Sequence, residues 1–225
     1  MKFFIDSANT HLIGKFIDMG IIDGVTTNPT LLAKEGADPI EQVKKILKLV
    51  PGSVNIEVVA TDYENMMSQA HSIVKLGTNA VVKIPMTTEG MRAVHTLSQE
   101  GIKTNVTLIF SATQALIAAK AGATYVSPFV GRLDDIKENG MDLVRDIAQI
   151  FKNYSIKTQI LVASVRSPAH IIEAAKLGAD VATVPPEVID KMFLHPLTDS
   201  GLKKFADDWK TLEKQYGDVF KKLQQ

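Results

Sequence analysis

A lysine and a glutamate interrupt two short apolar runs of the sequence. Lys83 lies in AVVKIPM, on the same strand face as Val81 and Pro85, and Glu57 lies in VNIEVVA. Lysine is seldom buried without a partner or a function. Burial disfavours the ammonium form, and a neutral amine can attack a carbonyl to form an iminium. We therefore interpret Lys83 as a candidate Schiff-base nucleophile; the alternative is a lysine that protects an exposed sheet edge.

Glu57 lies on the apolar run that precedes the run of Lys83. If the two runs are neighbouring strands, the two side chains stand beside each other. A carboxylate at that position can pass protons during imine formation and hydrolysis. A purely structural ion pair is the other interpretation, and the residues alone leave both open.

Two arginines follow later apolar runs. Arg132 comes just after YVSPFV, and Arg166 comes just after ILVASV. A guanidinium matches phosphate oxygens bidentately, so the two arginines together predict a phosphate site. A surface salt bridge is the alternative for each one. The remaining candidates end a strand or share a strand face, and they are Asp6, Asn28, Asn105, Thr107, Ser127, Phe129 and Ser164. For Asp6 and Asn28, helix capping competes with a functional role.

Eight strand-length runs rich in Val, Ile and Phe recur along the whole chain. They are Lys2–Asp6, Gly24–Thr27, Val54–Ala60, Ala80–Met86, Thr104–Phe110, Tyr125–Val130, Gln159–Ser164 and Val181–Val184. Segments with helical spacing lie between them, and several close on a glycine that predicts a left-handed C-cap, at 77, 101, 122 and 178. Such alternation predicts a parallel α/β sheet.

A count of eight strands favours a closed (β/α)8 TIM barrel. An open doubly wound sheet is disfavoured because no Gly-rich dinucleotide loop follows the first strand. We expect residues 1–225 to form a single barrel domain whose active site lies at the carboxyl ends of the strands. An apolar stripe from Leu202 to Leu223 predicts an extended C-terminal helix over 198–223. That helix packs on its own barrel or on a neighbouring subunit.

Composition narrows the classes of partner. The 225 residues carry 25 basic and 25 acidic side chains, a net charge of zero, which argues against nucleic acid or an anionic membrane surface as partner. The absence of cysteine excludes disulfides and thiolate chemistry, and the five histidines show no ligand spacing, so we expect no metal site. No run reaches the roughly 20 apolar residues of a membrane helix, and Asp6 comes too early for a signal peptide. We predict a cytoplasmic protein.

The motifs FIDSAN, GVTTNPTLL, EVVA, VVKIPMT, NVTLIFS, VSPFVGR and VASVRSP together resemble the small single-domain transaldolases. The resemblance covers essentially the whole chain. It implies a TIM barrel that transfers a dihydroxyacetone unit between ketose and aldose phosphates, such as sedoheptulose 7-phosphate and glyceraldehyde 3-phosphate. It also implies no cofactor and a homo-oligomer, a pentamer or a decamer of two pentameric rings.

The same resemblance implies a role for each candidate. Lys83 corresponds to the Schiff-base lysine and Asp6 to the acid/base at the sugar C4 hydroxyl. Glu57 and Thr107 correspond to a pair that positions a catalytic water. The residues that contact the three-carbon unit correspond to Asn28, Asn105 and Ser127, and those of the phosphate site to Arg132, Ser164 and Arg166.

Two rival functions remain at this point. Fructose 6-phosphate aldolase shares the fold and the lysine but carries Gln at the position of Glu57 and Tyr at the position of Phe129. A tyrosine hydroxyl can order a water that protonates the enamine and releases dihydroxyacetone, whereas a phenyl ring cannot. These residues favour transfer over release. The second rival, of another class, is a barrel that isomerises or binds sugar phosphates without a Schiff base.

Overall fold

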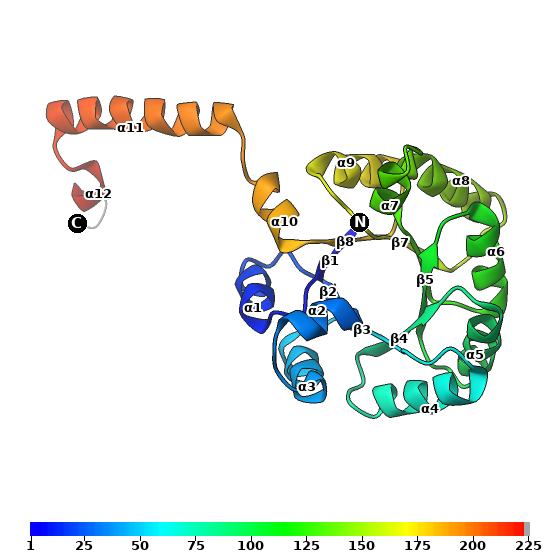
Figure 1. Cartoon of the computed structure of the whole chain (residues 1–225). Coiled ribbons are helices and arrows are strands. Elements are labelled where there is room, and N and C mark those ends of the chain that lie inside the picture. Colours follow the sequence, from blue (N-terminus) through cyan, green and yellow to red (C-terminus); the bar gives the residue numbers. More distant parts are fainter. Residues whose placement is uncertain (223–225) are drawn as a thin grey trace. The chain divides into compact units, whose positions relative to one another are not determined.

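The computed structural model describes residues 1–222. Their contacts divide them into two compact units, Met1–Ile189 and a second that begins at Asp190. In the first unit, eight parallel strands close into a barrel in sequence order, with helices around the outside (Figure 1). The strands are β1 (Lys2–Asp6), β2 (Gly24–Thr26), β3 (Ser53–Glu57), β4 (Ala80–Pro85), β5 (Thr104–Ile109), β6 (Tyr125–Pro128), β7 (Gln159–Val162) and β8 (Val181–Val184). The predicted TIM barrel is confirmed, and the strands differ from the predicted runs only at their ends.

The helices of the first unit alternate with the strands. They are α1 (Thr10–Asp18), α2 (Pro29–Lys34), α3 (Pro39–Leu49), α4 (Tyr63–Val74), α5 (Thr88–Gln99), α6 (Ala112–Ala121), α7 (Val130–Asp135), α8 (Gly140–Asn153), α9 (Pro168–Leu177) and α10 (Pro186–Met192), the last of which crosses into the second unit.

Most of these helices begin at a side chain that accepts a hydrogen bond from a first-turn amide, which satisfies one of the free N–H groups there. These N-caps include Asn9, Asn28, Asp38, Asp62, Thr87, Ser111 and Asn139. Three of the four predicted C-terminal glycines, at 101, 122 and 178, have a positive φ, whereas Gly77 does not. Polar caps at the helix starts and glycine at the helix ends therefore set where each strand meets its helix.

The two faces of the strands belong to two different cores. Residues that point outward, such as Ile5, Val82 and Val106, pack against the helices in one large apolar cluster. The lumen holds a second, smaller cluster of buried side chains, made of Phe4, Val81, Tyr125, Leu161, Ala163 and Val181. Because side chains alternate along a strand, a strand can contribute side chains to both cores.

The second unit consists mainly of α11 (Pro196–Tyr216) and α12 (Val219–Lys222). The sequence predicted one helix over 198–223, but the helix begins earlier and stops at Tyr216, where Gly217 has φ +72° and serves as the C-cap. Glycine adopts this conformation at no steric cost. Leu223, the last residue of the predicted stripe, lies outside the described residues. None of the described helices combines the length and apolarity needed to cross a lipid bilayer.

Candidate active site

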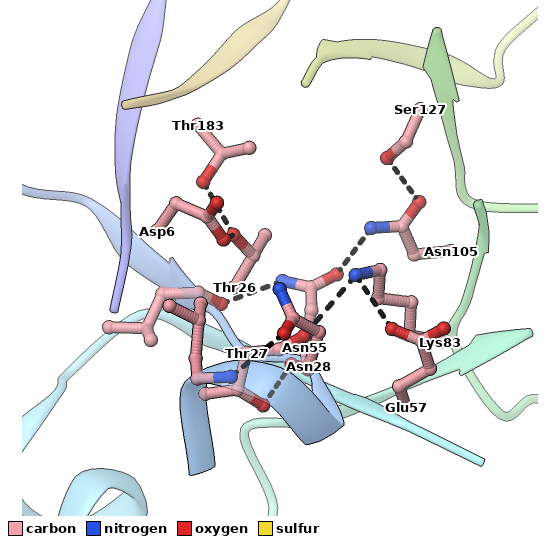
Figure 2. A network of polar contacts seen from close by, with 12 residues as sticks. Asp6, Thr26, Thr27, Asn28, Asn55, Glu57, Lys83, Asn105, Ser127 and Thr183 are labelled. Carbon is pink, nitrogen blue, oxygen red and sulfur yellow. Dashed lines mark hydrogen bonds and ion pairs between the residues drawn. The ribbon is translucent and has the colours of Figure 1, made fainter. Parts of the chain in front are cut away.

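Lys83 and Glu57 are brought together by the pairing of β3 with β4. The two residues are register partners, and Lys83 Nζ lies 3.0 Å from Glu57 Oε2 (Figure 2). Lys83 Nζ also donates to the carbonyl oxygen of Thr27 at 3.2 Å. Only 5% of Lys83 is exposed, and a closed barrel has no edge strand to protect. The edge interpretation of this lysine therefore fails, whereas the ion pair and the proton shuttle are both compatible with the geometry.

Asp6 ends β1 inside the barrel, where Thr26 Oγ1 donates to Asp6 Oδ1 at 2.7 Å. Thr26 in turn shares a hydrogen bond with Thr183 Oγ1, so hydroxyls from β2 and β8 support the carboxyl group (Figure 2). Burial raises the pKa of Asp6 above its ordinary value of 3.8, and it outweighs the opposing effects of Thr26 and Lys83. The capping alternative is wrong for Asp6, because the N-cap of α1 is Asn9.

A chain of buried hydrogen bonds links β6, β5, β3 and β2 across the barrel. Ser127 Oγ donates to Asn105 Oδ1 at 2.8 Å, and Asn105 Nδ2 donates to Asn55 Oδ1 at 3.0 Å. Asn55 Nδ2 then donates to the carbonyl oxygen of Val25 at 3.1 Å. Each amide has its orientation fixed by a neighbour, so the hydroxyl of Ser127 is held rigidly at the upper end of the chain.

The strand that carries Thr107 is irregular at its end. The register of β5 against β6 shifts between Val106 and Ile109, and Leu108 has φ +61°, a conformation that costs a branched side chain energy and clusters at functional sites. Thr107 Oγ1 is buried and has no hydrogen-bond partner among the described residues. A buried hydroxyl of this kind is suited to hold a ligand or a water.

The site opens into two adjoining cavities of about 200 and 370 Å³. Lys83, Asn28, Phe129 and Arg132 line both of them. Ten of the eleven predicted site residues line one or both cavities; the other six are Asp6, Glu57, Thr107, Ser127, Ser164 and Arg166. Asn105 lines neither cavity and lies beneath them, hydrogen-bonded to Ser127 and Asn55.

Asn28 caps a helix and also lines both cavities. Its Oδ1 accepts from the amide of Leu31 at 2.9 Å and caps α2, with Pro29 in the first helical position. Because the oxygen is engaged, the amide nitrogen is the group of Asn28 that can donate to a ligand in the cavities.

The two arginines lie at the mouth of the site on separate elements. The guanidinium of Arg132, on α7, stacks over the Phe129 ring at 5.0 Å from its centroid. Arg166 Nη2 lies 3.1 Å from Asp135 Oδ2, in an ion pair in which both side chains are exposed. The surface salt bridge expected as the alternative is therefore present for Arg166. Such an exposed pair contributes little to the stability of the protein.

Sequence reasoning missed Asn55, Thr26 and Thr183. Asn55 precedes Glu57 by two residues, and Thr26 precedes Asn28 by two. Side chains two apart on a strand share a face, so the same parity argument that found Lys83 could have found these residues. Thr183 gave no comparable signal, since a threonine in VATV is ordinary for a strand.

The fold and the site define a (β/α)8 barrel whose lumen presents a buried lysine, two carboxylates and a rim of arginines. The family model described as Transaldolase/Fructose-6-phosphate aldolase matches residues 3–216. The chain belongs to this family.

Similar proteins agree with this family. A protein named probable transaldolase from Methanococcus maripaludis strain C7 is 60% identical over 93% of this chain and 97% of its own length. Another of that name, from Thermodesulfovibrio yellowstonii, is 58% identical over 95% of this chain and all of its own length. Inosine 5′-monophosphate dehydrogenase from Legionella pneumophila has a similar structure, with a TM-score of 0.60 at 14% identity. The match covers 84% of this chain and 58% of the dehydrogenase, and it shows the fold alone.

Proposed function

We propose that this chain is a transaldolase that moves a dihydroxyacetone unit between ketose and aldose phosphates through a Schiff base on Lys83. The observation that carries the proposal is the buried amine of Lys83, 3.0 Å from the Glu57 carboxylate, at the floor of a cavity that Asp6 also lines. An amine beside a proton acceptor inside a largely enclosed lumen suits attack on a ketone.

The first steps form the iminium. The Lys83 amine adds to C2 of the ketose, and the carbinolamine loses water as protons pass to and from Glu57. Thr107 Oγ1, buried without a partner among the described residues, and Glu57 line the same cavity. The pair is therefore well placed to hold the water that leaves and later returns.

The next steps break and remake the C3–C4 bond. Asp6 accepts the proton of the C4 hydroxyl, the bond electrons move into the iminium, and an aldose leaves as an enamine forms. The enamine attacks the incoming aldehyde, Asp6 returns the proton, and hydrolysis frees the new ketose. A carboxyl whose pKa is raised by burial is a better match for taking and returning a proton near neutral pH than an ordinary aspartate.

Arg132 and Arg166 bind the phosphate group of the substrate. Arg132 and Arg166 line the mouth of the cavity that reaches Lys83. Guanidinium groups bind phosphate oxygens in bidentate pairs. Sugar phosphates that place their carbonyl at Lys83 can therefore place their phosphate at these arginines.

Phe129 favours transfer over release of dihydroxyacetone. Its ring lines both cavities and carries no hydroxyl that could order a water to protonate the enamine. We expect fructose 6-phosphate with erythrose 4-phosphate to give sedoheptulose 7-phosphate much faster than fructose 6-phosphate alone gives free dihydroxyacetone. Substantial release without an acceptor would favour the aldolase instead. The double variant Glu57→Gln, Phe129→Tyr should raise release relative to transfer, and an unchanged ratio would count against this role of Phe129.

We further propose that the protein is a homo-oligomer, a pentamer or a decamer, and acts in the cytoplasm. Apolar residues recur at helical spacing along α11, from Leu202 through Phe205 and Trp209 to Leu212. A stripe of this kind suits packing on another subunit. Sedimentation of the full chain tests the assembly, and a monomer at micromolar concentration would contradict it.

A further inference from the structure

His170 is placed differently from the other histidines that the sequence shows. It lies in the first turn of α9, and only 16% of its side chain is exposed. Its Nδ1 accepts a hydrogen bond from the main-chain N–H of Arg166 at 3.3 Å. Its Nε2 lies 3.0 Å from Asp134 Oδ2. The ring therefore joins α7, which carries Asp134, to the segment that carries Arg166.

The contacts fix both the tautomer and the orientation of the ring. An Nδ1 that accepts from an amide leaves the proton on Nε2, where it is donated to Asp134. Asp134 is itself held, because its Oδ1 accepts from the amide of Gly140 at 3.0 Å. The N-cap of α9, Ser167, makes no side-chain capping bond. His170 thus fixes the entry to this helix, where a cap would usually do so.

The stem of Arg166 lies close against α7. A Cβ at position 131 would lie 2.7 Å from both Cγ and Nε of Arg166, and the Gly131 amide donates to the Ser164 carbonyl at 3.0 Å. Glycine at 131 is therefore required for this approach. Among the described residues, the guanidinium is held only by the exposed pair with Asp135, and such a pair is weak. The main chain of Arg166 has a partner of its own: its N–H donates to His170, whose ring is in turn paired with Asp134.

We propose that His170 is a positioning residue for phosphate recognition. Held by Asp134, its ring fixes the main chain of Arg166 so that the guanidinium meets the phosphate of the sugar. The inference rests on the proposed function, which assigns Arg166 to the phosphate. This role also gives a reason for the burial of His170, which is not spaced from the other histidines as a metal ligand would be and yet has only 16% of its side chain exposed.

A pair of variants isolates the bond to Arg166. In His170→Asn, Oδ1 is as many bonds from the main chain as Nδ1 of histidine, so the acceptor is kept. In His170→Gln, Nε2 matches the distal ring nitrogen, so the bond to Asp134 is kept, whereas no acceptor remains at the position of Nδ1. His170→Phe removes both bonds, and His95→Phe is the control, because His95 is an exposed residue of α5.

The readout compares phosphorylated with unphosphorylated donor at saturating acceptor. For fructose 6-phosphate, we expect KM to rise roughly fivefold to tenfold in His170→Gln and His170→Phe, the effect of one lost hydrogen bond, with kcat nearly unchanged. We expect His170→Asn, which keeps the acceptor but loses the bond to Asp134, to raise KM less than His170→Gln does, and His95→Phe to stay close to wild type. For unphosphorylated fructose, kcat/KM should be the same in all of these proteins.

The outcomes separate this inference from the proposed function. Arg166→Ala is measured alongside, and it should raise the KM for fructose 6-phosphate at least as much as His170→Phe. If Arg166→Ala raises KM and His170→Gln does not, the inference is overturned and the phosphate site stands. If Arg166→Ala leaves KM unchanged, the phosphate site itself fails. Equal losses for both donors, or equal effects of Asn and Gln, would show a merely structural role. If His170→Phe does not fold, the Asn and Gln variants decide.

Discussion

The two layers of the barrel lumen use the same strands for opposite purposes. In the lower layer, Phe4, Val81, Tyr125 and Val181 pack together as an apolar plug. Two residues further along the same strands lie Asp6, Lys83, Ser127 and Thr183. These residues line the cavity above. One repeat of the strand, about 6.6 Å, separates side chains that stabilise the fold from side chains placed for chemistry. A single short strand can therefore contribute one side chain to the apolar cluster and another to the cavity, because the two side chains lie in different layers.

The energetic difference between the layers follows from their contents. Apolar burial in the lower layer stabilises the barrel by roughly 1.5–3 kcal/mol per large side chain. The upper layer has the opposite tendency, because burial disfavours the charge of Asp6 and leaves Thr107 Oγ1 without a partner among the described residues. The lower layer thus stabilises a barrel that holds unfavourable groups in the upper one.

The largest expected effect is on activity and belongs to the upper layer. Lys83→Ala removes the nucleophile, so we expect turnover with fructose 6-phosphate and erythrose 4-phosphate to fall by about 10⁴-fold or more, with the barrel retained by circular dichroism. Lys103→Ala, an exposed lysine beside β5, is the control and should keep full activity. A Lys83→Ala enzyme that keeps more than about one percent of wild-type turnover would show that Lys83 is not the nucleophile.

The next largest effect is on stability and belongs to the lower layer. Leu161 is fully buried in the apolar plug. We expect Leu161→Ala to lower the free energy of unfolding by about 2–5 kcal/mol, measured by urea denaturation, with kcat/KM of the folded enzyme nearly unchanged. A loss of activity without a loss of stability would show that the two layers are not separate.

Substitution of Thr107 should change the free energy of unfolding less than Leu161→Ala does, and in the opposite direction. Valine has nearly the same shape as threonine and lacks the hydroxyl that has no partner among the described residues. We expect Thr107→Val to be neutral or to stabilise the protein by up to about 1 kcal/mol while it lowers kcat. Destabilisation by more than about 1 kcal/mol would mean that this hydroxyl supports the fold.

The smallest expected effect is the contribution of Asp6 to the pH dependence of the protein's stability. Its pKa is raised in the folded protein, so the folded state binds the proton more tightly than the unfolded state does. Stability from this group is present below about pH 3.8 and is lost as pH rises through the folded pKa. Asp6→Asn cannot ionise, so its melting temperature relative to wild type should increase from pH 4 to pH 8, while its turnover is lost. A difference that does not change with pH, or that decreases, would show that the carboxylate is not disfavoured.

The repeating patterns of the sequence were sufficient to predict the barrel, and they also identified most of the residues that the structure brings to its two cavities. Alternation of apolar strands with helices predicted the eight-stranded barrel, and parity on one strand placed Lys83 beside Glu57. What parity cannot predict is depth and partner choice. Asn105 shares the lumen with Thr107, yet its amide is engaged beneath the cavities. The break at Gly217 and the link from His170 to Arg166 depend on local backbone conformation and on contacts between separate elements, which periodicity does not encode.

The proposed function depends on a covalent intermediate that the amine of Lys83 forms with the sugar. Borohydride reduction in the presence of fructose 6-phosphate, followed by peptide mass spectrometry, tests it most directly. We expect loss of activity together with a stable three-carbon or hexose phosphate adduct on the peptide that contains Lys83, and no adduct in Lys83→Ala. Full activity without an adduct under turnover conditions, or an adduct on another lysine alone, would contradict the proposed function and favour a sugar-phosphate isomerase or binding barrel that needs no Schiff base.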